Sequence, residues 1–182
     1  MKYRHVALLR GINVGGNNII KMVDLKSLFE ELGFSDVSTY IQSGNVIFSS
    51  AESNLARLSR KIERALGKRF VYKACVAIVS QSTLTSVVKQ APKGFGKAPS
   101  KYRYDVIFFK APATPKAAIG DIAVREGVDA VAAGKHAVYA SRLIARASQS
   151  RISKIVSHPL YKSMTIRNWN TITKLLSLMK HV

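Results

Sequence analysis

The sequence predicts an α+β protein in which a ferredoxin-like βαββαβ unit is followed by a second, related α/β half and by C-terminal helices. Two observations lead to this fold class. Short apolar segments alternate with segments of helical periodicity, in the order strand, helix, strand, strand, helix, strand. The tripeptide Lys-Tyr-Arg occurs at residues 2–4 and again at 101–103, each time ahead of an apolar run, which indicates an internal duplication. We therefore expect a ferredoxin-like subdomain over residues 1–80 and a second α+β subdomain over 81–182.

The first strand and the first helix follow from the spacing of apolar residues. Residues 5–10 form a short apolar run before a Gly/Asn-rich turn, which is typical of a buried strand. The next segment predicts a helix that ends at Gly33. Its apolar positions recur at helical spacing: Met22, Leu25, Leu28, Phe29 and Leu32.

The rest of the first unit is a hairpin, a helix and a strand. Residues 37–41 and 46–49 are rich in β-branched and aromatic side chains, and the polar residues between them suit a hairpin turn. A second amphipathic helix ends at Gly67, and a buried strand follows over 74–79. The apolar face of that helix consists of Leu55, Leu58, Ile62 and Leu66.

The second half repeats this theme less fully. We expect a helix over 83–90, a loop over 91–100, a strand over 102–109, a helix over 115–125, and a hairpin formed by 129–133 and 136–141. A final helix has Thr165 as its N-cap. Its apolar side carries Ile166, Trp169, Ile172, Leu176 and Met179.

Charge is the most unusual feature of the composition. The chain of 182 residues carries 29 lysines and arginines against 10 acidic residues, a formal net charge of +19, and no acidic residue follows Asp129. A field of this sign attracts polyanions such as nucleic acid or phosphorylated ligands. Solubility, or an adaptation of one organism, would also account for it.

The sequence contains no sign of a membrane or an export signal. No apolar run approaches the roughly 20 residues that span a bilayer, and the apolar stretch near the N-terminus is too short for a signal peptide. Cys75 is the only cysteine and has apolar neighbours, so we expect a buried thiol in a reducing compartment. These features predict a cytoplasmic protein with no membrane partner.

Motifs of conventional enzymes are absent from the sequence. The four histidines are scattered without metal-ligand spacing, and there is no nucleophile elbow, phosphate loop or zinc-deaminase signature. We therefore expect no metal and no cofactor, and the sequence leaves open whether the protein is an enzyme.

The most informative segment for function is the glycine/asparagine-rich stretch 10–18. Its glycines allow successive backbone N–H groups to point at one acceptor, and the following helix N-terminus adds partial positive charge. The polar candidates for an anion cradle are Arg10, Asn13, Gly15, Gly16 and Asn17. Equally, the segment could be a tight turn whose asparagines cap the helix and satisfy loop amides.

A second polar cluster, Gln42-Ser43-Gly44-Asn45, lies between the two strands of the first hairpin. A plain hairpin turn accounts for it without a ligand. We expect this turn and the 10–18 loop to lie at opposite ends of the sheet, so that a shared site would need the second half of the chain or a strand bulge.

A third polar cluster opens the predicted last helix. Arg167, Asn170, Thr171 and Lys174 have the spacing of one helix face, with Asn168 beside them and Trp169 on the apolar side. Trp169 is expected in the core. The polar face could line a site or could bind loop backbone.

The second helix carries a basic stripe on its outer face, formed by Arg57, Lys61, Arg64 and Lys68 with Arg60 beside it. A solvated surface and a nucleic-acid footprint are the two interpretations.

The three polar clusters resemble the signatures of a family of unknown function, numbered 1697, of bacterial-type proteins. The residues that match are Arg10, Asn13, Gly15, Gly16, Asn17, Gln42, Ser43, Gly44, Asn45, Arg167, Asn168 and Asn170. The resemblance implies a ferredoxin-like, duplicated α+β fold and no activity.

From these observations the sequence favours a protein that binds an anionic ligand, for which nucleic acid is one candidate and a phosphorylated ligand another. The glycine/asparagine loop and the polar flank of the last helix would then share one donor-rich surface. The alternative is an enzyme for a small polar or phosphorylated substrate, which would use amide and guanidinium donors to stabilise developing negative charge. The sequence does not determine the oligomeric state.

Overall fold

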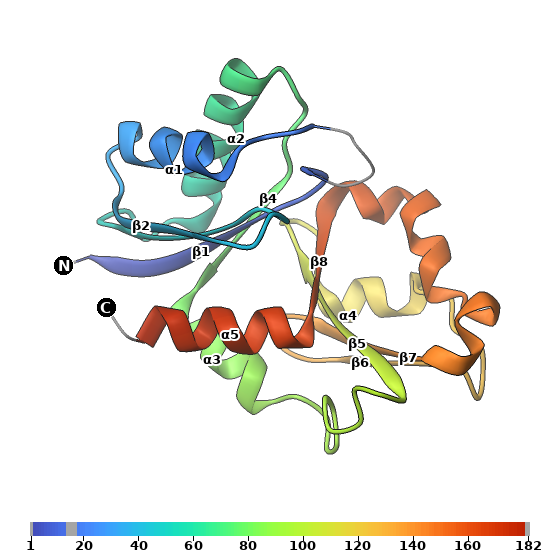
Figure 1. The fold of residues 1–182 in the computed structure, drawn as a ribbon. Coiled ribbons are helices and arrows are strands. Elements are labelled where there is room, and N and C mark those ends of the chain that lie inside the picture. The colour runs from blue at the N-terminus through green and yellow to red at the C-terminus, as the bar shows by residue number, and fades with distance from the viewer. Residues whose placement is uncertain (1, 14–17, 181–182) are drawn as a thin grey trace. The chain divides into compact units, whose positions relative to one another are not determined.

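The computed structural model describes residues 2–13 and 18–180. The chain forms two compact units, of which the first comprises residues 1–82 with 175–182 and the second residues 83–174 (Figure 1). Three of the candidate residues, Gly15, Gly16 and Asn17, lie outside the described residues.

The first unit is built on a four-stranded antiparallel sheet with the strand order β2-β3-β1-β4. Helices α1 and α2 lie on one face of this sheet (Figure 1). The elements are β1 (Tyr3–Leu9), α1 (Met22–Glu31), β2 (Ser35–Tyr40), β3 (Asn45–Ser50), α2 (Leu55–Phe70) and β4 (Val76–Ser80).

The second unit contains another four-stranded antiparallel sheet, with the order β6-β7-β5-β8. Its strands are β5 (Tyr102–Phe109), β6 (Asp129–Ala133), β7 (Val138–Leu143) and β8 (Met164–Asn168). It also contains α4 (Pro115–Ala118) and the short 3₁₀ helices η1 (Ile119–Asp121), η2 (Ile144–Gln149), η3 (Ile152–Ser157) and η4 (Pro159–Ser163). Two further helices, α3 (Gln81–Lys89) and α5 (Trp169–Lys180), have residues in both units.

The two sheets have the same topology. In each, the first strand of the unit lies in the centre, between the third and the fourth, and the second strand forms an edge. The predicted α+β class, with a βαββαβ unit followed by a related half, is confirmed.

Helix α2 is the best-anchored cover of the first sheet. Leu58, Ile62 and Leu66 recur every four residues and are at most 1% exposed. The Asn54 side chain caps the helix by accepting from the backbone N–H of Arg57 at 3.0 Å. These contacts make α2 a rigid support for the charges on its outer face.

Two polar side chains of α2 also bind one residue of β4. The Ser59 hydroxyl donates to the Val76 carbonyl at 2.8 Å, and a Glu63 carboxylate oxygen accepts from the Val76 N–H at 2.9 Å. Both backbone groups of Val76 are thereby satisfied, which fixes the helix along the sheet.

The helical cover of the second sheet is shorter than expected. The helix predicted over 115–125 ends at Ala118 and continues only as the 3₁₀ helix η1, because Gly120 interrupts it with the low helix propensity of glycine. The apolar cluster of this unit is covered by short helices and consists of Ile107, Ile122, Val138, Ala140, Ile152, Ile155 and Met164.

The start of the last helix was predicted wrongly. Residues 164–168 form strand β8, and α5 begins only at Trp169. Thr165 is not an N-cap: it pairs with Phe108 of β5 and is 1% exposed. The free edge of β5 recruits this segment, and a pairing between residues so distant in the chain overrides the local helical spacing.

In residues 2–13 and 18–180, no helix combines the length and the apolar character that crossing a membrane requires.

Candidate functional site

The glycine/asparagine loop and the first hairpin turn meet at the same end of the first sheet. Because β1 and β3 are antiparallel, Leu8 near the end of β1 pairs with Asn45 at the start of β3, and the Leu9 N–H donates to the Gly44 carbonyl at 2.8 Å. The expectation that loop and turn lie at opposite ends was wrong. The antiparallel order itself brings them together, without the second unit.

Asn13 joins the two segments. Its Nδ2 donates to the carbonyls of Ile20 and Gln42, each at 2.9 Å, and its Oδ1 accepts from the Ile20 N–H at 2.8 Å. In the same loop the Asn18 side chain donates to the Gly11 carbonyl at 2.8 Å. These bonds give both asparagines a structural role in satisfying loop amides, and a ligand-binding role for Asn13 stays a prediction.

The hairpin turn is closely packed. Asn45 is fully buried, and its Nδ2 donates to the Tyr40 carbonyl at 2.9 Å and to the Ser43 hydroxyl at 3.1 Å. Gly44 has a φ of +76°, and a Cβ there would lie 2.8 Å from the Ile12 side chain. The turn therefore requires glycine for both conformation and space.

Arg10 is half-buried at the end of β1, where its backbone N–H donates to the Cys75 carbonyl at 3.0 Å. Burial raises the pKa of the nearby Tyr72 hydroxyl, and Cys75 and Glu63 raise it further, whereas the positive charge of Arg10 acts in the opposite direction. A guanidinium near a neutral phenol, a thiol and a carboxylate is thus part of this end of the first sheet.

Arg167 lies on β8 and not on the last helix, so it does not share a helix face with Asn170. It is 8% exposed, and its guanidinium donates to the Thr165 hydroxyl and to the Ile166 carbonyl, both at 2.9 Å. Burial lowers its pKa to about 10, and Tyr161 opposes that shift. Arg167 contributes to the interior of the second unit.

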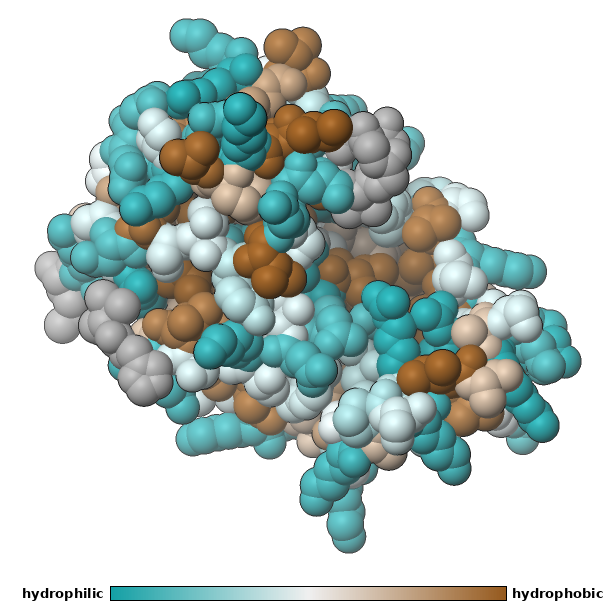
Figure 2. Space-filling view, in the orientation of Figure 1, coloured by the Kyte–Doolittle hydropathy of each residue, from teal (hydrophilic) through white to brown (hydrophobic). Residues whose placement is uncertain are grey.

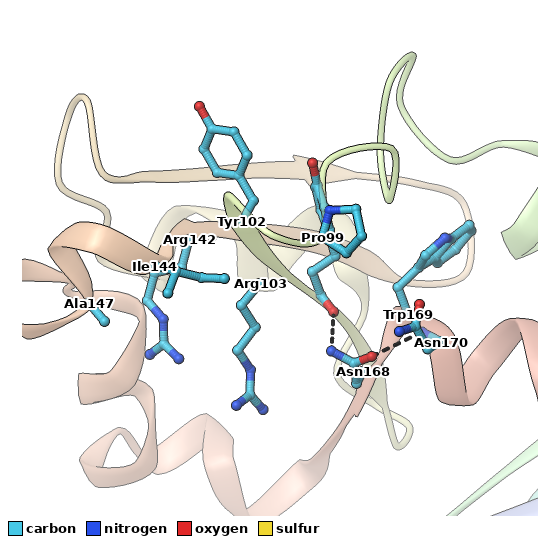
Figure 3. A pocket seen from close by; sticks show the side chains of 10 residues that line it. Pro99, Tyr102, Arg103, Arg142, Ile144, Ala147, Asn168, Trp169 and Asn170 are labelled. Carbon is cyan, nitrogen blue, oxygen red and sulfur yellow. Dashed lines mark hydrogen bonds between the residues drawn. The ribbon is translucent and has the colours of Figure 1, made fainter.

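Asn168 and Asn170 line a groove of about 390 Å³ in the second unit. The Asn168 amide donates to the Tyr104 carbonyl at 3.1 Å and accepts from the Asn170 N–H at 3.0 Å (Figure 3). Trp169, expected in the core, is half-buried and lines the same groove. Convergence of this segment with the 10–18 loop, which belongs to the first unit, stays a prediction.

The basic stripe of the second helix forms a continuous surface. Its five residues, Arg57, Arg60, Lys61, Arg64 and Lys68, are all exposed and line one hollow of about 360 Å³, with Leu32 and Ala65 as its apolar wall. We call this surface the basic face of α2. In the space-filling view, hydrophilic side chains cover much of the visible face of the protein, with small groups of apolar side chains between them (Figure 2).

Two members of the basic face have partners within the protein. The Lys61 ammonium donates to the Leu32 carbonyl at 2.6 Å and lies 5.0 Å from the centre of the Phe34 ring. Arg57 forms an ion pair with Glu52 at 3.0 Å. Among the described residues, the other three cations, Arg60, Arg64 and Lys68, have no hydrogen-bond or ion-pair partner.

Two arginines of the groove, Arg103 and Arg142, were missed by sequence reasoning. They face each other directly on β5 and β7, so their side chains leave the sheet on the same face, as Figure 3 shows. The repeated tripeptide at 101–103 marked Arg103, but the cross-strand register that adds Arg142 is not visible in a single sequence.

Within the described part of the chain, no group of three or more His, Cys, Asp and Glu side chains could hold a metal ion.

Comparison with known proteins identifies the family but no activity. A conserved bacterial protein of Streptococcus pneumoniae has a similar structure, with a TM-score of 0.85 and 24% sequence identity over 98% of this chain and 99% of that one. The comparison with curated proteins gave no match. A family model described as a protein of unknown function, DUF1697, matches residues 2–139, which include the first two polar clusters. The chain therefore belongs to this family of unknown function, DUF1697.

Proposed function

We propose that the protein binds nucleic acid through the basic face of α2, by contacts to the phosphate backbone. The observation that carries this proposal is that five exposed cations line a single hollow on one rigid helix, and that Arg60, Arg64 and Lys68 have no partner among the described residues. Lysine and arginine side chains that neutralise phosphates supply most of the affinity of non-specific nucleic-acid binding.

The geometry of the helix suits a backbone ligand. From Arg57 to Lys68 the basic face extends about 16 Å along α2, since an α-helix rises 1.5 Å per residue. A duplex presents one charge per about 1.7 Å of its axis, so several phosphates fall within reach of this face. The net charge of +19 would accelerate the approach of any such polyanion.

Backbone contacts predict a binding that depends strongly on salt and weakly on sequence. We would measure fluorescence anisotropy of a labelled DNA duplex and of a single-stranded RNA over a series of salt concentrations. The test variant combines Arg60→Gln, Arg64→Gln and Lys68→Gln. Its plot of log affinity against log salt for the duplex should be shallower by roughly 3, at about 0.9 per lost phosphate contact.

A control variant with the same change in net charge separates a local site from general attraction. Lys93, Lys97 and Lys135 are exposed in the second unit, and changing all three to glutamine should leave the slope nearly intact. The proposal fails if the unchanged protein does not bind either probe at low salt, or if the control loses as much affinity as the test variant.

A further inference from the structure

Each unit has an arginine at the same position of its central strand, but the residue opposite that arginine differs between the units. β1 and β5 occupy the same central place in their sheets, and each begins with Tyr-Arg. Arg4 on β1 lies opposite Ser49, whereas Arg103 on β5 lies opposite Arg142. The repeat therefore replaces a serine with a second arginine at this register position.

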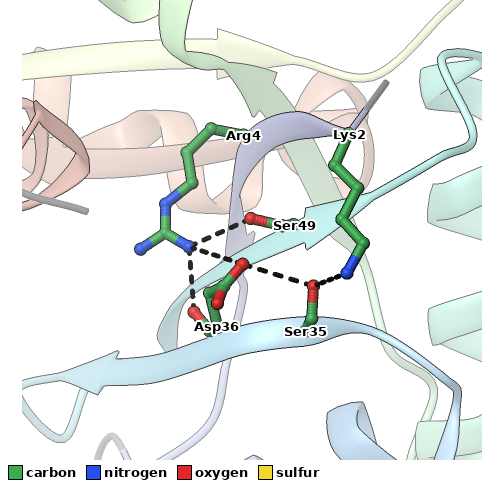
Figure 4. A network of polar contacts seen from close by, with 5 residues as sticks. All are labelled: Lys2, Arg4, Ser35, Asp36 and Ser49. Carbon is green, nitrogen blue, oxygen red and sulfur yellow. Dashed lines mark hydrogen bonds and ion pairs between the residues drawn. The ribbon is translucent and has the colours of Figure 1, made fainter.

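In the first unit the arginine is part of the structure. Its side chain is 11% exposed, and the guanidinium donates to the Ser49 hydroxyl at 3.1 Å and to the Asp36 carbonyl at 3.0 Å. A carboxylate oxygen of Asp36 lies 4.0 Å away. Figure 4 shows this network, in which the Lys2 ammonium also donates to the Ser35 hydroxyl, and that hydroxyl donates to the Asp36 carboxylate. One terminal nitrogen of Arg4 thus has its partners within the protein, while its Nε is buried without a hydrogen-bond partner among the described residues.

In the second unit the two guanidinium groups have few partners within the protein. The Arg103 side chain is 52% exposed and is held only through its Nε, which donates to the Asp105 carboxylate at 2.8 Å. This contact orients the guanidinium and leaves its two terminal NH₂ groups without a hydrogen-bond partner among the described residues. Among the described residues, Arg142 has no hydrogen-bond or ion-pair partner for its guanidinium.

The acidic residue opposite Arg142 on the neighbouring strand forms no ion pair with it. Asp129 on β6 lies opposite Arg142 in the register. Its carboxylate instead accepts from the Ser150 hydroxyl at 2.7 Å and from the backbone N–H groups of Arg125 and Arg151 at 3.0 and 2.8 Å. Like charges directly opposite each other destabilise a sheet. Two guanidinium groups thus share one face of the sheet with the carboxylates of Asp105 and Asp129, and neither carboxylate forms an ion pair with Arg142.

Two hollows of the second unit meet at these arginines. The groove of about 390 Å³ has Arg103, Arg142 and the polar Asn170 in its lining, together with the aromatic Trp169. A second hollow of about 230 Å³ shares both arginines and continues along Ile155 and neighbouring apolar residues of η3. The first hollow has the size of an ordinary small-molecule site.

We propose that Arg103 and Arg142 bind the phosphate groups of a nucleoside diphosphate or a similar phosphorylated ligand, whose ring lies in the part of the groove that Trp169 and Asn170 line. Guanidinium groups present paired N–H donors that match phosphate oxygens. The Trp169 indole is held by an edge contact with the Phe95 ring, whose centre lies 5.2 Å away, and by the Gly96 backbone, so it is a fixed part of the groove lining. The Asn170 side chain is exposed at the same groove and supplies a further donor and acceptor. The site lies within the second unit and does not depend on the basic face of α2.

The single tryptophan gives a local signal for this site, because Trp169 is the only one in the chain. We would titrate the protein with ADP and with inorganic pyrophosphate, follow tryptophan fluorescence, and confirm binding by calorimetry. ADP should change the fluorescence in a saturable way, and pyrophosphate should compete for the site with lower affinity because it lacks the ring.

The decisive variant is Arg142→Ser, which restores the arginine–serine pairing that the first unit has at this position. It should remain folded, with an unfolding temperature equal to or above that of the unchanged protein, and should bind ADP at least tenfold more weakly. Arg142→Lys keeps the charge but loses the planar fork, so it should fall between the two. Arg146→Gln, which removes an exposed arginine that lines neither hollow, should bind normally.

Three results would overturn the proposal. The first is the absence of saturable binding of both probes. The second is equal binding of ADP by the Arg142→Ser variant and the unchanged protein, or an equal loss in the Arg146→Gln control. The third is pyrophosphate binding as tightly as ADP, which would remove the ring from the ligand class. None of these outcomes bears on the nucleic-acid test, which changes residues of the other unit.

Discussion

The two units of this protein have the same sheet topology under different cover. The first sheet has α1 and the 16-residue α2 on one face, and the unit also includes the end of α5 from Leu175. All six residues of its β3 are buried, so both faces of that strand are covered. Over the second sheet the corresponding positions are occupied by the four-residue α4 and by 3₁₀ helices, and the last three residues of β7 are only half-buried. One sheet topology can thus support both a closed core and an open groove.

The arginines of the two sheets differ in the same way, with one enclosed and the others lining a groove. Arg4 is enclosed and bound by Ser49 and Asp36, whereas Arg103 and Arg142 line a groove. The second sheet can tolerate the repulsion between Arg103 and Arg142, because this repulsion is small compared with the total free energy of unfolding.

The largest expected effect tests the difference in cover. Leu66→Ala removes a fully buried side chain of α2 and should lower the free energy of unfolding by about 3 kcal/mol. Ile152→Ala in η3 removes a side chain that is 9% exposed beneath a short helix, and should cost about 2 kcal/mol or less. Equilibrium unfolding in denaturant measures both. Equal losses would show that the second core is as closely packed as the first.

The second prediction, of intermediate size, compares the contributions of Arg4 and Arg103 to stability. Arg4→Ala breaks hydrogen bonds of a charged group that is mostly enclosed and should cost about 2 kcal/mol. Arg103→Ala breaks an ion pair at a half-exposed position and should change stability by no more than about 0.5 kcal/mol. The same denaturant experiment measures both variants. A larger loss for Arg103 than for Arg4 would contradict the assignment of structural and binding roles.

The smallest effect concerns pH and belongs to the first unit. His5 on β1 is 2% exposed, and burial lowers its pKa below the usual 6.5, with the Glu52 backbone opposing the shift. The folded state therefore binds fewer protons than the unfolded state. The contribution of His5 is complete above about pH 6.5 and is lost as the pH falls through 6.5 towards the lower pKa of the folded state.

Thermal unfolding measured between pH 8 and pH 5 would detect this dependence, and His5→Gln should weaken it. His136, in the turn between β6 and β7, provides the matched control, since His136→Gln should leave the dependence in place. A dependence that survives in the His5 variant would place its origin in another group.

The periodic parts of the fold could be predicted from the sequence, and the non-local parts could not. The helix ending at Gly33 and the apolar stripe of α2 carry their information in neighbouring residues. Strand β8 does not. Ile166, Trp169 and Ile172 have helical spacing, and only the pairing of Ile166 with Ile107 on a distant strand makes the segment extended.

The candidate site shows the same limit. The basic face of α2 was visible as a helical stripe, and the structure brings all five side chains to one hollow. Arg142 could not be identified, because its meaning depends on the register of β5 against β7. The place of the hairpin turn beside the 10–18 loop was mispredicted for a simpler reason. Because β3 runs antiparallel to β1, the start of β3 lies at the end of β1, where the loop begins.

Amide chemical-shift mapping of the isotope-labelled protein during titration with ADP tests the division of roles between the two units most directly. Our account predicts that the shifts concentrate at Arg103, Arg142 and residues 168–170, while Arg4 and Ser49 stay unchanged. Shifts of equal size at both arginine positions, or shifts confined to the first unit, would contradict it.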